Sequence, residues 1–98
     1  MNTTIITAQD VTMVASSITN KPTEEIRSET RKASVVAIRD ICFKICKDHL
    51  FMVQHDIAEY FGRNRSSIAH GLNRVEKNLE KRPQYRKLYN AILQKLDI

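Results

Sequence analysis

The residue types best suited to chemistry lie in one short run, Arg63-Asn-Arg-Ser-Ser67. It holds two guanidinium groups, an amide and two hydroxyls within five residues. Arginine can pair through two hydrogen bonds with guanine or a phosphate, while serine and asparagine bond phosphates or base edges. A run that opens a helix also presents free backbone N–H groups, which suit an anion. These residue types favour contact with a nucleic acid.

A basic block surrounds and follows this run. From Gly62 to Lys87 there are eight Lys and Arg residues against two acids, so the segment carries +6 in a chain of net charge +5. Such a block on a near-neutral domain suggests a polyanion partner. The alternative is a solvated helix face, the usual origin of a charge run. Candidate phosphate contacts are Arg74 and Lys77, with Lys32 and Arg39 nearby.

His70 follows Arg65 by five residues in the same basic block. A lone helical histidine is more often a packed or surface side chain than a ligand. Its place in a candidate recognition helix gives a phosphate or groove contact about equal weight. Both interpretations stay open on the sequence.

Other chemistry finds little support in the sequence. Cys42, Cys46 and His49 share one side of a helix, but zinc takes four ligands and a second pair is missing. Both cysteines lie in the most apolar helix, where cysteine acts as a small hydrophobe. The two glycines, Gly62 and Gly71, form no phosphate-cradling loop, and no nucleophile or acid/base motif is present. We expect no enzyme, no metal and no other cofactor.

A pair of helices around Gly62 must position the basic run. Apolar residues up to Phe61 close a first helix, and the glycine can take a left-handed turn. Ile68, Leu72, Val75 and Leu79 then follow at helical spacing. A short helix, a glycine turn and a longer helix with a basic start are typical of a helix-turn-helix. We expect the second helix, Ser66–Glu80, to enter the major groove of DNA.

The rest of the chain predicts further helices, because two glycines and two prolines in 98 residues leave little turn chemistry. The fold class is all-α: a small bundle of about five helices, one domain over residues 1–98. In the central helix, Arg39 is expected to point away from the apolar face. The expected elements are a helix capped by Thr7 and ended by Asn20-Lys-Pro22, a helical turn at Thr23–Arg27, a loop at Ser28–Lys32, the central helix at Ala33–His49, a short turn at Leu50–Val53, the helix pair, and a last helix that begins at Pro83.

Targeting signals are not evident in the sequence. No apolar run approaches the ~18 residues of a membrane span. The first ten residues lack the basic head and apolar middle of a signal peptide. We expect a cytoplasmic, nucleoid-associated protein without a membrane partner.

At Phe61–Lys77, FGRNRSSIAHGLNRVEK, the sequence resembles the DNA-binding C-terminal domain (domain IV) of the bacterial replication initiator DnaA. That family's motif reads close to FGGRDHTTVLHAVRKIE. The resemblance extends back to Arg39 without a gap, and more loosely over nearly the whole chain. It implies a Trp-repressor-like helix-turn-helix. By this resemblance the residues at family positions that contact bases or phosphates are Arg63, Asn64, Arg65, Ser66 and Ser67, and those at its recognition-helix His and basic positions are His70 and Arg74.

The chain departs from the family motif at several positions. Arg65 stands for the family's His, Asn64 for its Asp, and one of two glycines is missing. Ala37 falls where the family has a minor-groove arginine, and the family's ATPase module is absent from these residues. The resemblance thus implies DNA binding, while recognition of the family's own target sequence does not follow. Arg65 favours a guanine or a phosphate at its position.

Two functions are weighed on the sequence. The leading hypothesis is a stand-alone, sequence-specific double-stranded DNA-binding protein of a bacterium or phage, acting in replication or transcription regulation. A homodimer or a protein partner would add affinity. The alternative is a protein-interaction module whose basic face meets an acidic replication or repressor protein. RNA is less well supported, because aromatic platforms for single strands are not evident.

Overall fold

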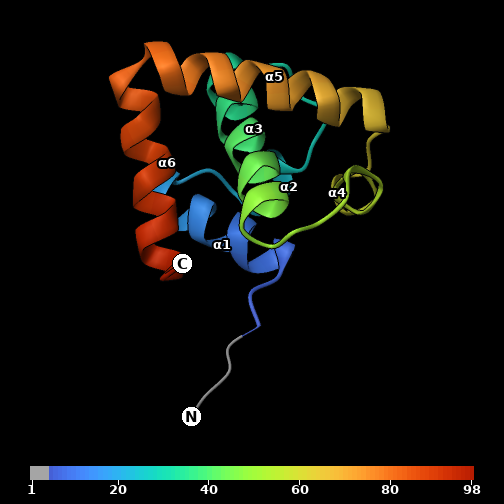
Figure 1. Ribbon diagram of the computed structural model, residues 1–98, viewed down its shortest axis with the longest axis horizontal. Helices are drawn as coiled ribbons and strands as arrows, with labels where there is room; N and C mark the ends of the chain where they lie inside the picture. Colours follow the sequence, from blue (N-terminus) through green and yellow to red (C-terminus); the bar gives the residue numbers. More distant parts are fainter. Residues whose placement is uncertain (1–4) are drawn as a thin grey trace.

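The computed structural model describes residues 5–98, and these form an all-α bundle (Figure 1). The predicted fold class is therefore confirmed. Five of the six helices have eight residues or more, and α2 is a single turn, in keeping with the expected five. The helices are α1 (Ala8–Thr19), α2 (Thr23–Ile26), α3 (Ala33–Asp48), α4 (Gln54–Phe61), α5 (Arg65–Lys81) and α6 (Pro83–Leu96). Among the described residues, no helix is both long enough and apolar enough to cross a bilayer.

The central helix of the bundle is α3, which lies between α5, α1 and α6 (Figure 1). Phe43 of this helix is buried, and so are the apolar residues at helical spacing along it: Val35, Ile38, Ile41, Cys42, Ile45 and Cys46. Burying one such side chain fully contributes about 1.5–3 kcal/mol relative to leaving it exposed. The helix therefore supplies the surface on which the other helices are fixed.

Local signals end and begin the helices as expected. Thr7 and Asp10 form a reciprocal capping box at α1, with the Asp10 N–H donating to the Thr7 hydroxyl and the Thr7 N–H donating to the Asp10 carboxylate. Asn20 ends α1 in the left-handed region at φ 60°. Pro83 occupies the first turn of α6, where its missing N–H is harmless.

The predicted helix-turn-helix consists of α4 and α5. Gly62 takes φ 65°, the left-handed conformation that glycine adopts without strain. The Arg63 N–H donates to the Ala58 carbonyl at 2.8 Å, which closes the end of α4. Phe61 and Ile68 are both buried, and the Phe61 ring packs edge-on against Phe43 of α3 at 4.9 Å between centroids. The turn is thereby locked onto the core.

Gly71 has a role that the sequence did not reveal. A Cβ atom at this position would lie 2.7 Å from both the Asp40 Oδ1 and the Phe43 ring, closer than real Cβ contacts. Phe43 and Asp40 are buried and cannot easily move aside. The missing side chain therefore lets α5 approach α3 closely at the middle of α5.

We predict that Gly71→Ala destabilises the protein, although alanine is the better helix former by about 1 kcal/mol. Forcing a methyl group into this contact should cost about 1–3 kcal/mol, because the buried ring has no free space to enter. Urea denaturation measures the change. Asn73→Ala, on the exposed side of α5, is the matched control and should be neutral or stabilising. Unchanged or increased stability of Gly71→Ala would refute the packing argument.

Candidate nucleic-acid interface

Helix α5 begins at Arg65, two residues after Arg63, the first residue of the basic run. Asn64 is the N-cap, and its Oδ1 accepts the Ser67 N–H at 2.8 Å. Its side-chain oxygen is thus engaged in starting the helix. Arg65 and Ser66 are exposed in the first turn, while Ser67 is partly buried. The first turn therefore presents the Arg65 side chain and the exposed Ser66 side chain to solvent.

One face of α5 turns away from the core along its length. Ile68, Gly71 and Val75 face α3 and are buried, so helical geometry places a second set of residues opposite them. The members of this set are exposed and recur every three or four residues, and we call them the outer face: Ser66, His70, Asn73 and Lys77.

Two residues of the outer face change the sequence-based view. His70 is exposed, so of the interpretations left open by the sequence it is a surface side chain and not a packed one, while a DNA contact stays a prediction. Asn73 was not singled out, although its spacing from the buried Ile68 and Val75 would have placed it on this face. Asparagine can pair with adenine through two hydrogen bonds, so Asn73 is a further candidate for base contact.

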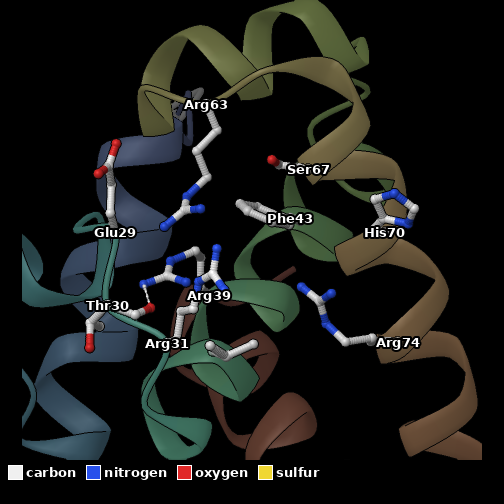
Figure 2. A pocket seen from close by; sticks show the side chains of 10 residues that line it. Glu29, Thr30, Arg31, Arg39, Phe43, Arg63, Ser67, His70 and Arg74 are labelled. Atoms are coloured by element: carbon white, nitrogen blue, oxygen red, sulfur yellow. Dashed lines mark hydrogen bonds between the residues drawn. The ribbon is translucent and has the colours of Figure 1, made fainter.

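Arg63 does not project outward with Arg65 as expected. It lies before the helix, and its Nη2 donates to the Ser28 carbonyl at 2.5 Å in the loop between α2 and α3. The Arg63 Nε is buried without a hydrogen-bond partner among the described residues. Figure 2 shows its guanidinium directed toward those of Arg31 and Arg39. The side chain joins the turn to the loop and does not extend the outer face.

The expectation that Arg39 points away from the apolar face is wrong, because the side chain is only 4% exposed. Its Nε donates to the Ile26 carbonyl at 2.8 Å. Its Nη2 donates to the Thr30 carbonyl at 3.2 Å (Figure 2). These carbonyls lie at the end of α2 and in the following loop, where no helical N–H serves them. Burial and the nearby charge of Arg63 lower the pKa of Arg39. Arg39 therefore holds the loop that follows α2 against α3.

Arg74 is already engaged with a buried acid. Its Nε and Nη2 donate to the two Asp40 carboxylate oxygens at 2.8 and 3.1 Å. The Asp40 side chain is 2% exposed and that of Arg74 50%. Burial raises the pKa of Asp40 above its ordinary 3.8, while the Arg74 guanidinium opposes that shift and has its own pKa raised. A phosphate at Arg74, as predicted, would therefore have to bind a guanidinium that already donates to Asp40 of α3.

Apart from Asn64, the N-cap of α5, the predicted site residues fall into two groups in space. Arg65, Ser66 and Lys77 are exposed on α5, and Lys32 is exposed at the start of α3. The other group lines a half-open pocket of about 700 Å³ between the loop, α3 and α5 (Figure 2). Its predicted members are Arg39, Arg63, Ser67, His70 and Arg74, and the loop adds Glu29, Thr30 and Arg31.

Cys42 and Cys46 belong to the core. Both are fully buried on α3, and burial raises the pKa of each thiol, that of Cys46 to about 12. Among the described residues, the one group with ligand atoms close enough for a metal is elsewhere, the exposed His55, Asp56 and Glu59 on α4.

Comparison with known proteins points to one family. Residues 8–75 match the family described as the bacterial dnaA protein helix-turn-helix. Three similar curated proteins are each named chromosomal replication initiator protein DnaA. That of Mycoplasma pneumoniae is 37% identical over 62 residues, 63% of this chain. Those of Lachnoclostridium phytofermentans and Mycoplasma genitalium are 29% and 30% identical over 76 and 74 residues, each 76% of this chain.

The chain spans only a small part of these relatives. The matched region is 14% of the M. pneumoniae protein and 17% of each of the other two. The similarity therefore concerns the helix-turn-helix segment, and the remaining parts of the relatives have no counterpart in the comparison.

We predict that Arg74→Ala lowers the free energy of unfolding by about 2 kcal/mol at pH 7, because a buried carboxylate loses its partner. The pKa of Asp40 is higher in the folded state than in the unfolded state. Between the two pKa values the folded state therefore binds more protons than the unfolded state, and the free energy of unfolding falls as pH rises through this range. Without Arg74 the pKa should rise further. The loss should therefore be smaller near roughly pH 4 than at pH 7.

Urea denaturation at both pH values measures this difference. The control makes the same Arg74→Ala change in an Asp40→Asn background, where no carboxylate is present at this site, and the loss relative to Asp40→Asn alone should be equal at both pH values. An equal loss for Arg74→Ala alone at both pH values would mean that the ion pair does not carry the effect.

Proposed function

Because the chain belongs to the bacterial DnaA helix-turn-helix family, we propose that it binds double-stranded DNA by placing α5 in the major groove. The observation that carries the proposal is the outer face of α5, a line of exposed polar side chains with no apolar residue in it. An α-helix of this kind fits the width of the major groove. The matches confirm the family resemblance seen at Phe61–Lys77.

The charges around α5 support this orientation. Arg65 lies at the start of the helix and Lys77 three turns later, both exposed. Glu76, an acid on the helix, forms an ion pair with Lys44 of α3, so its charge is compensated. Glu80 is the other acid on α5 and is exposed, so the positive charge available to phosphates is that of Arg65 at the start of the helix and of Lys77 on the outer face.

We propose that binding is sequence-specific and that Arg65 reads one base pair. Its exposed guanidinium in the first turn of α5 can bond guanine O6 and N7 together. Ser66, His70 and Asn73 of the outer face offer further groove contacts. Arg39 is not included, because it is buried and its guanidinium donates to the Ile26 and Thr30 carbonyls.

The biological role that fits best is in replication, since the similar proteins are named as chromosomal replication initiators. Transcription regulation uses the same kind of contact. In either role the 98-residue chain, acting as one domain, would bind duplex DNA by itself and be found at the nucleoid. A module of this size buries about 600–1,000 Å² on DNA, so a second copy or a partner protein would raise a modest affinity.

We predict that Arg65→Ala lowers affinity for the preferred sequence by about 1–3 kcal/mol and relaxes the preference at one base pair. Selection from a random duplex pool measures the preference. Arg82→Ala removes the same charge at the other end of α5 and should leave the preferred sequence unchanged. If the selected sequence is identical with and without Arg65, its base-reading role is wrong.

We also predict a steep dependence of duplex binding on salt. The logarithm of the binding constant should fall against the logarithm of salt concentration with a slope of about −0.9 per neutralised phosphate. Lys77→Gln should reduce the slope by about that amount. Lys87→Gln, on α6, should not change it. A flat response, or no binding to random duplex at low salt, would favour the alternative of an acidic protein partner.

A further inference from the structure

The half-open pocket beside α5 gathers positive charge. Four arginines and a histidine line it, against one acid, Glu29. In Figure 2 the guanidiniums of Arg31, Arg39 and Arg63 lie together on one side, and the Glu29 carboxylate points away from them. Arg74 faces them from α5 across the pocket, with its charge matched by Asp40. Three cations thus converge without a carboxylate between them.

This convergence is costly in the absence of an anion. Burial lowers the pKa of Arg39 most, and the charge of Arg63 lowers it further, because the two cations repel each other. Positive charge that converges in a partly desolvated hollow attracts an anion of matching size. The volume of about 700 Å³ admits a phosphate group with its hydration or substituents.

The lining residues divide into supports and available donors. Arg39 donates to the Ile26 and Thr30 carbonyls and Arg74 donates to Asp40, so both line the pocket with donors that are already in use. Arg63 keeps its buried Nε without a partner in the described chain. Figure 2 draws no hydrogen bond from Arg31, Ser67 or His70 to another lining residue. The unused donors come from the loop, the turn and α5.

We propose that this pocket binds one phosphate group, held by Arg31, Arg63 and Ser67. For a phosphate of the DNA backbone, the inference rests on the proposed function. Ser67 and His70 of α5 line the pocket, and His70 also belongs to the outer face, so a backbone bordering the groove that α5 occupies would pass the opening. A free phosphate ion offers the same chemistry. Arg31 thereby becomes a binding residue that the basic run did not indicate.

The first arm of the test uses duplexes of the selected sequence with a single neutral methylphosphonate at each backbone position. One position should lower affinity about tenfold in the unaltered chain, the effect of losing charged hydrogen bonds. In Arg31→Gln and in Ser67→Ala that position should lose its effect. Lys87→Gln, which removes an equal charge on α6, should keep it. Arg31 is exposed, so its replacement should leave the fold intact, and a circular dichroism melt checks this.

The second arm titrates the DNA-free chain with inorganic phosphate and follows backbone amide NMR signals. Saturable shifts at Ser67 and His70 that vanish in Arg31→Gln would support the pocket even if duplex binding failed. Duplex binding that depends on no single phosphate through Arg31, together with absent phosphate shifts, would overturn the inference and leave the proposed function standing. Failure of duplex binding alone counts against the proposed function only.

Discussion

The close contact between α3 and α5 is the constraint on which the rest of the structure depends. Gly71 has no side chain at the crossing, and the Asp40 carboxylate and the Phe43 ring occupy the space that a Cβ would need. One turn from the glycine, Arg74 reaches back to the same carboxylate. The crossing therefore combines close packing with a charge pair, and it fixes the rotation of α5 about its axis.

That rotation decides which side chains of α5 meet solvent. With Ile68, Gly71 and Val75 against α3, the opposite side must be Ser66, His70, Asn73 and Lys77. The Gly62 turn fixes the remaining variable, the direction in which α5 leaves α4. A change at the crossing would therefore act on the outer face without touching any of its residues.

The arginines near α5 perform different tasks that sequence position does not separate. Arg65 is exposed, while Arg63, two residues earlier, turns inward to a loop carbonyl. Arg39 and Arg63 hold the loop of residues 27–32 beside α5 by hydrogen bonds to its carbonyls and to that of Ile26. Arg27 adds a third link by donating to the Tyr60 carbonyl of α4 and lying 4.2 Å over the Tyr60 ring. Three of the arginines near α5 thus serve to hold the loop of residues 27–32 in place beside this helix.

The sequence by itself determined the features that depend on near neighbours in the chain. Helical spacing, the Thr7 capping box, the Gly62 turn and Pro83 at the start of α6 each act over a few residues, so the all-α class and the helix-turn-helix could be predicted. The family motif indicated the segment that carries the candidate interface.

Only the tertiary structure decided which basic side chains remain available. The burial of Arg39, the pairing of Arg74 with Asp40, the need for Gly71 and the recruitment of Arg31 to a shared pocket join segments about 10 to 40 residues apart. A periodic pattern reports which side of a helix is apolar, and it carries no information about which long polar side chain bends back to serve a carbonyl or carboxylate. That choice belongs to the packing, because a flexible cation bonds whichever buried acceptor the fold leaves within its reach.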